Sequence, residues 1–397
     1  GTWNDKRLPV AANYLQFLGT GDKTSEDISR EFYKLACSFN VSAGNEFTTI
    51  TLEGLGENFT QATALLEDLL ANARPDEEAL KALKARIAKG RADAKNNKGA
   101  LMQGLMSYAR YGANNPFNNV LSDNELNAIT AKELTDMIHG LTGYQHRILY
   151  YGPQPLNDFT AGIARLHKTP ATLTVAAAPK NFSFREQAGN EVLFADYDMV
   201  QSEIRWVRNI PGYDPAMQTR IELFNNYFGG NMGSIVFQTI RESKALAYST
   251  SAFFVTPERK EDPYYLSAYV GSQADKLNEA VGAMNELLTD LPSAENNLAN
   301  AKSSLVKDIE TERITQDAVI YSYLTAERRG LKEDYRQSIY KEAQSLGYND
   351  LKEFHTRYIS GKPYTYCIVA SEKRVAEKDL QKLGAVKKLS KEEIFGY

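Results

Sequence analysis

The chain has 397 residues, a net charge of −4, and 43% hydrophobic and 24% charged residues. That length exceeds one ordinary core and fits two domains of about 200 residues. The mixed charges argue against nucleic-acid or anionic-membrane partners, and no apolar run reaches the roughly 18 residues of a membrane span. Cys37 and Cys367 lie far apart and outside any CxxC pair. A disulfide framework and a cysteine-type zinc site are therefore not expected, and the compartment stays open.

The first half of the chain predicts helices and strands in a regular order. Thr24 and Asp27 form one helix-start signal, and Thr130 and Glu133 form another. The other helices and strands are predicted from the spacing of apolar residues and from glycine and proline turns. We expect helices over 8–18 and 25–37, strands over 38–43 and 47–52, an apolar helical stripe over 59–70, a long helix from 75 to 111, a helix after 130 and a strand over 146–151.

The second half predicts the same order of elements, preceded by two additional strands. Glycines at 229 and 230 end its first helix, and Gly271 is read as the end of its second hairpin strand. We expect strands over 191–195 and 201–207, a helix over 215–228, a short helix, strands over 246–255 and 264–270, a helical stripe over 277–291, a long helix opened by Pro292, a helix over 349–358 and a closing strand over 364–369.

The two halves therefore read as copies of one α+β unit, each an antiparallel-rich sheet packed by helices. Gly229 follows Gly19 by 210 residues, and Leu351 follows Leu134 by 217. The opening strands of copy two have no counterpart in copy one, so we expect the first domain to lack its N-terminal strands and to be completed by a longer parent or by another chain. The expected domains are 1–175 and 176–397, joined by a linker over 167–190.

Familiar catalytic and cofactor motifs do not appear in the sequence. The four histidines form no HxxEH or HxxxH pattern, and each is interpreted as an ordinary surface or helix-end residue, so no metal site is expected. The segment containing Gly229, Gly230 and Gly233 follows a helix rather than a strand, which argues against a dinucleotide fingerprint. No Ser-His-Asp set can be assembled.

The stretch 227–250, YFGGNMGSIVFQTIRESKALAYST, is where we look for chemistry. Arg241 and Tyr248 lie seven residues apart, on either side of a helix-to-strand turn. On residue chemistry alone a structural role stays open, because arginine suits a helix C-terminus and tyrosine is common in strands.

The whole pattern resembles the pitrilysin (M16) family of zinc metallopeptidases, which includes insulin-degrading enzyme and mitochondrial processing peptidase. The resemblance is strongest over FGGNMGSIVFQTIRESKALAYS, where Arg241 and Tyr248 match the paired Arg-x6-Tyr of the half without zinc, and it continues in FLGT at 17–20. In the zinc half, an HxxEH motif precedes that tetrapeptide. Its positions fall here on Val10, Asn13 and Tyr14, none of which suits zinc chemistry.

The resemblance implies a LuxS/MPP-like metallohydrolase fold and the C-terminal, zinc-free half of a metalloendopeptidase. Zinc and the general base would belong to an N-terminal partner half, with peptides as substrates. Tyr248 would donate a hydrogen bond to the developing oxyanion, and Arg241 would hold the substrate backbone. Gly229, Gly230 and Gly233 would let the substrate backbone approach. The alternative is a non-catalytic scaffold or assembly subunit with the same fold.

Overall fold

The computed structural model describes residues 1–315 and 318–397 and divides the chain into two compact units. Unit 1 comprises residues 1–95, 116–182 and 395–397, and unit 2 comprises residues 96–115 and 183–394. The expected mixture of helices and sheet is confirmed. The domain limits expected from the sequence, 1–175 and 176–397, remain a prediction.

Unit 1 packs its helices against a two-stranded antiparallel sheet, in which Cys37 pairs with Gly54 and Ala43 with Thr48. Capping boxes form at both predicted helix starts. The elements are α1 (Leu8–Leu15), α2 (Ser25–Lys34), β1 (Cys37–Ala43), β2 (Thr48–Gly54), η1 (Gly56–Asn58), α3 (Phe59–Asn72), α4 (Glu77–Lys95), α6 (Asp123–Ala128), α7 (Ala131–His139), η2 (Leu141–Gly143) and α8 (Leu156–Leu166).

Two predictions in this half are wrong. The predicted strand over 146–151 is irregular chain with exposed Ile148 and Leu149, because no neighbouring strand supplies backbone partners for it. The helix predicted from 75 to 111 is two helices, α4 and α5 (Lys98–Tyr111). Between them Asn97 leaves helical geometry, and its side chain accepts a hydrogen bond from the Ala100 amide. That N-cap starts α5, which belongs to unit 2.

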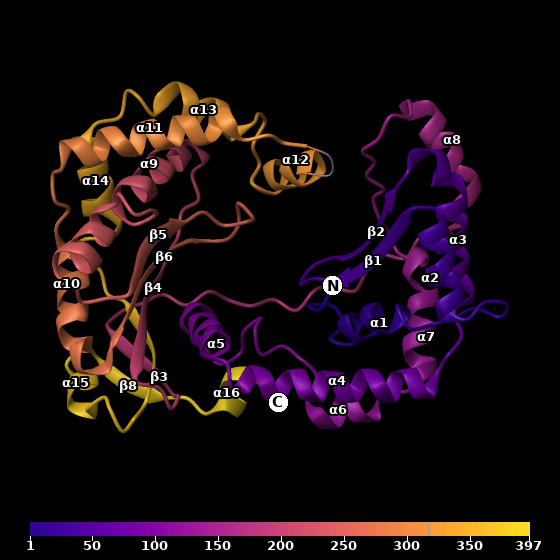
Figure 1. Cartoon of the computed structure of the whole chain (residues 1–397), viewed down its shortest axis with the longest axis horizontal. Helices are drawn as coiled ribbons and strands as arrows, with labels where there is room; N and C mark the ends of the chain where they lie inside the picture. Colours follow the sequence, from indigo (N-terminus) through magenta and orange to yellow (C-terminus); the bar gives the residue numbers. More distant parts are fainter. Residues whose placement is uncertain (316–317) are drawn as a thin grey trace. The chain divides into compact units, whose positions relative to one another are not determined.

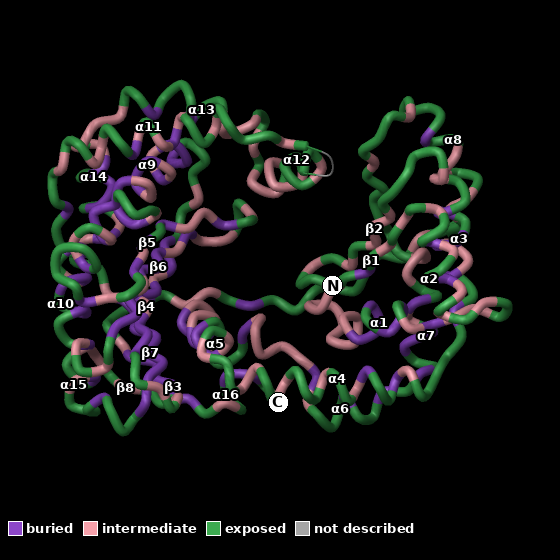
Figure 2. The backbone as a smooth tube through the Cα atoms, viewed as in Figure 1, coloured by how far each residue is buried: buried purple, intermediate pink, exposed green. Residues whose placement is uncertain are grey.

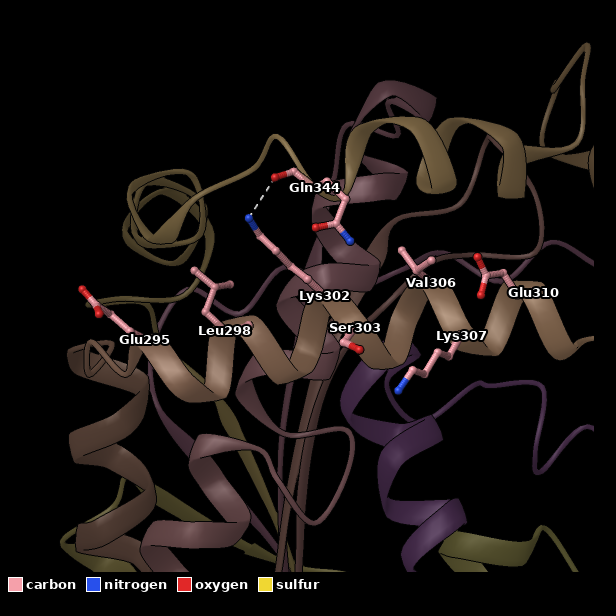
Figure 3. A pocket seen from close by; sticks show the side chains of 9 residues that line it. Glu295, Leu298, Lys302, Ser303, Val306, Lys307, Glu310 and Gln344 are labelled. Carbon is pink, nitrogen blue, oxygen red and sulfur yellow. Dashed lines mark hydrogen bonds between the residues drawn. The ribbon is translucent and has the colours of Figure 1, made fainter.

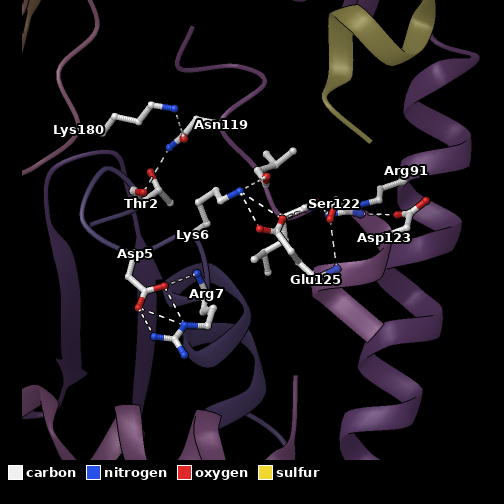
Figure 4. Close-up of polar contacts among 12 residues, drawn as sticks. Thr2, Asp5, Lys6, Arg7, Arg91, Asn119, Ser122, Asp123, Glu125 and Lys180 are labelled. Carbon is white, nitrogen blue, oxygen red and sulfur yellow. Dashed lines mark hydrogen bonds and ion pairs between the residues drawn. The ribbon is translucent and has the colours of Figure 1, made fainter. Parts of the chain in front are cut away.

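Polar contacts fix the N-terminal residues of unit 1 (Figure 4). Lys6 Nζ lies 3.2 Å from Glu125 Oε2 and also donates to the Val120 carbonyl. Arg91 of α4 pairs with Asp123 at the start of α6. These pairs join elements far apart in the sequence, and they account for this charged cluster without a ligand.

Unit 2 is built on a six-stranded mixed sheet with strand order β5-β6-β4-β7-β3-β8 (Figure 1). β3 runs parallel to β7 and β8, and the other neighbours are antiparallel. The strands are β3 (Glu191–Asp196), β4 (Gln201–Ile210), β5 (Ser249–Val255), β6 (Tyr264–Gln273), β7 (Thr365–Ala370) and β8 (Ala385–Lys388).

Helices cover both faces of this sheet. Helix α5 packs against β3, β4 and β7, while α9 contacts β5 and α10 contacts β6. The helices after α5 are η3 (Pro215–Met217), α9 (Gln218–Phe228), η4 (Phe237–Ser243), η5 (Ala274–Lys276), α10 (Leu277–Thr289), α11 (Glu295–Thr311), α12 (Ala318–Arg328), α13 (Tyr335–Glu342), α14 (Tyr348–Tyr358), α15 (Glu377–Gln381) and α16 (Lys391–Phe395). Helices α12, α13, α15 and α16 and strand β8 were not predicted from the sequence.

The core of unit 2 lies between the sheet and the helices α9, α10 and α14, and buried residues follow the central strands (Figure 2). β4 alternates sides: Ile204 and Trp206 enter this core, whereas Glu203 and Arg205 face the α5 side. In the described part of the chain, no helix has both the length and the hydrophobicity needed to cross a bilayer.

A tyrosine hydroxyl closes the start of a long helix in each unit. Tyr14 donates to the Asp76 carbonyl and accepts from the Asp76 amide, both at 2.7 Å. Tyr227 donates to the Pro292 carbonyl at 2.6 Å and accepts from the Ala294 amide at 3.0 Å. Both side chains are fully buried. The internal repeat predicted from the sequence is thus visible as a repeated contact.

A histidine makes a second repeated contact. His139 at the end of α7 donates from Nε2 to the Ala73 carbonyl, and His355 in α14 donates to the Leu287 carbonyl, each at 2.9 Å. His139 is exposed, but His355 is buried. His355 was interpreted as an ordinary surface or helix-end residue; it does lie in the last turn of α14, but it is buried in the core, and burial lowers its pKa.

Candidate functional site

Tyr248 stands directly before β5, on the sheet face that α5 covers. Its amide donates to the Gly271 carbonyl at 3.0 Å, and this bond sets where its side chain leaves the sheet. Its hydroxyl donates to Glu203 Oε1 at 3.3 Å, and the residue stays 41% exposed. The ring is thus anchored at its backbone and held weakly at its tip, as a group that exchanges partners must be.

Gly271 makes room for that ring. A Cβ atom at this position would lie 2.5 Å from Tyr248 Cζ and 2.6 Å from its hydroxyl oxygen. The expectation that Gly271 interrupts the chain is wrong, because β6 continues through it to Gln273. Its missing side chain serves a close approach within a strand.

Glu203 is the anion under Tyr248. It is 7% exposed, and its Oε1 lies 2.6 Å from Lys98 Nζ at the first turn of α5. The hydrogen bond with Glu203 raises the pKa of Lys98, which keeps the lysine charged at neutral pH. Burying a carboxylate costs stability unless it is paired, and Lys98 supplies that partner.

Tyr269 of β6 lies beside this group. Burial, a hydrogen bond with Tyr248 and the charge of Glu203 raise the pKa of Tyr269 well above its usual range. The Arg205 guanidinium stacks 4.9 Å from the Tyr269 ring centroid. We call Lys98, Glu203, Arg205, Tyr248 and Tyr269 the tyrosine network. It presents the Tyr248 hydroxyl at the surface, with charged side chains beneath it.

The sequence analysis found only one member of the tyrosine network. Lys98 and Glu203 are 105 residues apart in the sequence, so their contact depends on the packing of α5 against β4. A signal did exist: Glu203 and Arg205 occupy alternate positions in a strand whose opposite face carries the apolar Ile204 and Trp206. Two ionisable residues on one face of a central strand indicate a buried polar network.

Arg241 lies apart from this network. It is near the end of η4, a π-helical turn, and its guanidinium stacks 4.8 Å from the Phe237 ring. Its side chain is 45% exposed, and its nearest acid is Glu242 at 3.8 Å. Across residues 1–315 and 318–397, no hydrogen bond or ion pair joins Arg241 to Tyr248.

The turn between η4 and β5 is held in a strained conformation. Ala245 has φ 49°, in the left-handed region that non-glycine residues rarely adopt. The amide of Leu246 donates back to Ile240 at 3.0 Å, and the Leu246 side chain is buried. π-Turns and strained residues are frequent at functional sites, which favours a functional reading of this turn.

The glycines predicted to meet substrate make close contacts inside unit 2. A Cβ at Gly229 would lie 2.4 Å from the Ala252 nitrogen, and one at Gly230 would lie 2.8 Å from the Asn225 carbonyl oxygen. A Cβ at Gly233 would meet the Asn231 side chain at 3.3 Å. Packing alone therefore explains Gly229 and Gly230. Substrate binding by Gly229, Gly230 and Gly233 stays a prediction.

Gly229 and Asn225 also cover part of the outer edge of β5. The Ala252 amide donates to the Gly229 carbonyl at 3.1 Å. The Asn225 side chain accepts from the Phe254 amide at 2.8 Å and donates to the Phe254 carbonyl at 3.0 Å. An added peptide strand therefore finds the backbone groups of Ala252 and Phe254 already engaged.

The positions where a zinc motif would fall do not fit a metal. Val10 is buried, Tyr14 is committed to the start of α4, and Asn13 donates to the Pro9 carbonyl. Among the described residues, no three His, Cys, Asp or Glu side chains converge to hold an ion. These residues do not fit a catalytic zinc.

A surface groove of about 470 Å³ runs along α11 (Figure 3). Lys302 Nζ donates there to the Gln344 carbonyl at 3.0 Å. The groove contains none of the candidate residues, and its lining carries no cysteine or histidine. It is lined by Glu295, Leu298, Ala299, Lys302, Ser303, Val306, Lys307, Glu310 and Gln344.

Comparison with known proteins finds a family match over part of the chain. Residues 165–305 match the model described as the peptidase M16 inactive domain. The resemblance to M16 peptidases drawn from the sequence is thereby confirmed, and the matched range includes Arg241, Tyr248 and all three glycines.

Three relatives illustrate the similarity. The "Uncharacterized zinc protease YmxG" of Bacillus subtilis is 22% identical over 308 residues, which are 75% of this chain and 73% of that protein. The M16 inactive domain from Pseudomonas fluorescens superposes with TM-score 0.70 at 18% identity, over 95% of this chain and 92% of that one. The ferredoxin protease FusC, in complex with Arabidopsis ferredoxin, gives TM-score 0.72 at 14% identity. The chain spans 41% of FusC and aligns over 94% of its own length.

Proposed function

We propose that this chain is the zinc-free half of an M16-type zinc metalloendopeptidase, and that it binds peptide and stabilises the transition state in a clamshell chamber. The M16 inactive domain and relatives named as zinc proteases support the reaction class. The observation that carries the proposal is the exposed Tyr248 hydroxyl on the buried Glu203, which is paired with Lys98. Zinc and its base would come from an N-terminal partner half.

Tyr248 is the oxyanion donor in this proposal. Its 3.3 Å bond to Glu203 is long for an O–H donor and is easily exchanged. When substrate arrives, the hydroxyl turns its proton toward the carbonyl oxygen on which charge develops. A preorganised donor of this kind contributes about 10²-fold or more in rate.

Arg241 orients the peptide, with Gly229, Gly230 and Gly233 as proposed backbone contacts. Its guanidinium is always charged and offers several N–H donors in a fixed plane. The exposed side chain has one acid at 3.8 Å and so retains donors for substrate carbonyls. Orientation lowers the entropic part of the barrier.

The test is proteolysis by this chain purified with its zinc-bearing partner half. Tyr248→Phe should reduce kcat about 10²-fold while leaving KM nearly unchanged. Tyr265→Phe is the matched control, since Tyr265 lies in β6 and stacks with Arg110 through its ring alone. Wild-type kcat in Tyr248→Phe would instead favour the alternative, a non-catalytic scaffold or assembly subunit.

A further inference from the structure

Two histidines that are distant in the sequence meet in unit 1. His146 follows η2, and His167 directly follows α8. Their Nε2 atoms lie 2.9 Å apart, with the rings nearly perpendicular at 89°. The sequence analysis interpreted both as ordinary surface or helix-end residues; His146 is exposed and His167 caps the end of α8, but the contact between them was not predicted.

The outer nitrogens of both rings already have acceptors. His146 Nδ1 lies 2.6 Å from the Tyr144 carbonyl oxygen, and His167 Nδ1 lies 2.7 Å from Glu67 Oε1. A carbonyl or carboxylate oxygen only accepts, so each Nδ1 must carry the hydrogen. Each neutral ring then presents an unprotonated Nε2 to the other. Two lone pairs at that distance repel, and the arrangement requires a positive charge between them.

We propose that His146 and His167 bind one divalent transition-metal ion through their Nε2 atoms, with Cu²⁺ favoured over Ni²⁺ and Zn²⁺. Two nitrogens 2.9 Å apart, each about 2.05 Å from a shared ion, subtend about 90° at it. A tetrahedral zinc site would instead separate them by about 3.3 Å. Right-angled imidazole pairs suit the tetragonal geometry of Cu²⁺ and Ni²⁺, and Cu²⁺ has the highest affinity in this series.

The surroundings of the pair match those of metal-bound histidines. Such ligands characteristically donate their second nitrogen to a carboxylate or a backbone carbonyl, which fixes the tautomer and raises ligand basicity. Glu67 and Tyr144 supply one of each. His146 is exposed, so an ion and its waters can reach the site. Because no third protein ligand converges in the described chain, water completes the coordination.

The bound ion would act as a structural clasp within unit 1. Coordination would join the irregular segment at 144–146 to the end of α8, closing a loop of 21 residues. Binding to the folded state alone raises its stability by mass action. This site is separate from the catalytic zinc of the proposed function and can be studied without the partner half.

The experiment is Cu²⁺ titration of this chain alone, by calorimetry and by thermal unfolding. We expect one Cu²⁺ per chain, two nitrogen ligands in the electron paramagnetic resonance spectrum, and a rise in Tm. His146→Gln and His167→Gln should each weaken binding at least tenfold, and Glu67→Gln about tenfold. His139→Gln, which alters a histidine bonded only to a backbone carbonyl, should bind Cu²⁺ as the wild type does.

Three results would overturn the metal site. The first is unchanged Cu²⁺ affinity in the His146→Gln, His167→Gln double variant. The second is equal loss of binding in His139→Gln. The third is no Cu²⁺ binding by the wild type together with a proton shared between the two Nε2 atoms in ¹⁵N nuclear magnetic resonance spectra. That outcome would assign the positive charge to a proton.

Discussion

The helix-to-strand turns of the two units share a backbone feature and differ in their side chains. Ala36 precedes β1 with φ 47°, and Ala245 lies in the turn before β5 with φ 49°. The residues four before and three after the alanine are Phe32 and Phe39 in unit 1, whose ring centroids lie 4.9 Å apart. In unit 2 the same positions hold Arg241 and Tyr248, which are exposed and do not touch.

This difference separates what the repeated unit needs for folding from what is added in one copy. The left-handed alanine, the tyrosine at the helix start and the histidine on a backbone carbonyl occur in both units. Aromatic packing fills the turn in unit 1. In unit 2 two polar groups replace it, although apolar contact there would be worth more to stability.

The largest expected effect is at Gly271, where the missing side chain makes room for the Tyr248 ring and the Tyr269 hydroxyl. Gly271→Ala places a Cβ about where the Tyr248 ring lies, so the hydroxyl must move from Glu203. In the reconstituted protease we expect kcat to fall about 10²-fold, as with Tyr248→Phe. Gly282→Ala in α10, where a Cβ meets no atom within 4 Å, is the control. Equal activity in both variants would mean that Tyr248 need not stay in place.

The second prediction concerns what the units share. Tyr14→Phe and Tyr227→Phe each remove a buried hydroxyl that satisfies two backbone groups, at an expected cost of about 1–3 kcal/mol. Hydrogen exchange should locate the loss at the start of α4 in one variant and of α11 in the other. If one of the two substitutions leaves the stability unchanged, this repeated contact does not stabilise both units.

The third prediction uses the different burial of the repeated histidines. Burial lowers the pKa of His355 below its unfolded value of about 6.5, so the neutral form stabilises unit 2. Below that pH the unfolded chain binds more protons than the native one. Stability is therefore complete above about pH 6.5 and falls as pH drops to the lowered pKa, by at most about 1.4 kcal/mol per pH unit.

Urea unfolding of wild type and His355→Gln between pH 7.5 and 5.5 measures this loss. The variant keeps an amide donor for the Leu287 carbonyl and should show a shallower decline, whereas His139→Gln in unit 1 should follow the wild-type curve. If the unfolding free energy depends on pH identically in all three proteins, His355 is not the source of the loss.

The smallest effect is expected at the left-handed alanines. Ala36→Gly and Ala245→Gly each relieve about 1–2 kcal/mol of left-handed strain but increase the entropy of the unfolded chain. A net gain of about 0.5 kcal/mol is expected in both, measured by chemical denaturation. Loss of protease activity only in Ala245→Gly would indicate that the strain positions Arg241 and Tyr248.

Local signals in the sequence predicted most of the helices and strands. The capping boxes beginning at Thr24 and Thr130 were read correctly, as was the hairpin of β1 and β2. The strand expected over 146–151 fails because alternation over six residues does not reveal whether a neighbouring strand exists. Gly271 was misread for a related reason. Its missing side chain makes room for the ring of Tyr248, which precedes β5 and is distant in the sequence.

The candidate site, like the fold, was predicted where the signal is local and missed where it depends on distant contacts. Arg241 and Tyr248 were found because a local segment of eight residues contains them both. Lys98, Glu203 and the meeting of His146 with His167 depend on contacts between distant segments, which no local pattern encodes. Burial of His355 likewise depends on the contacts that α14 makes with α9 and α10, not on the sequence of α14 itself.

The break at Asn97 has a consequence for how the chain folds. Helix α5 is made before most of unit 2, yet it covers β3, β4 and β7, the last of which ends at Ala370. Pairing segments so far apart is slow, because chain entropy is lost before the contacts form. During synthesis α5 is therefore made before its packing partners, and Leu101 and Leu105 stay exposed until the sheet forms. A fragment beginning at residue 176 would leave that face of the sheet bare and prone to aggregate.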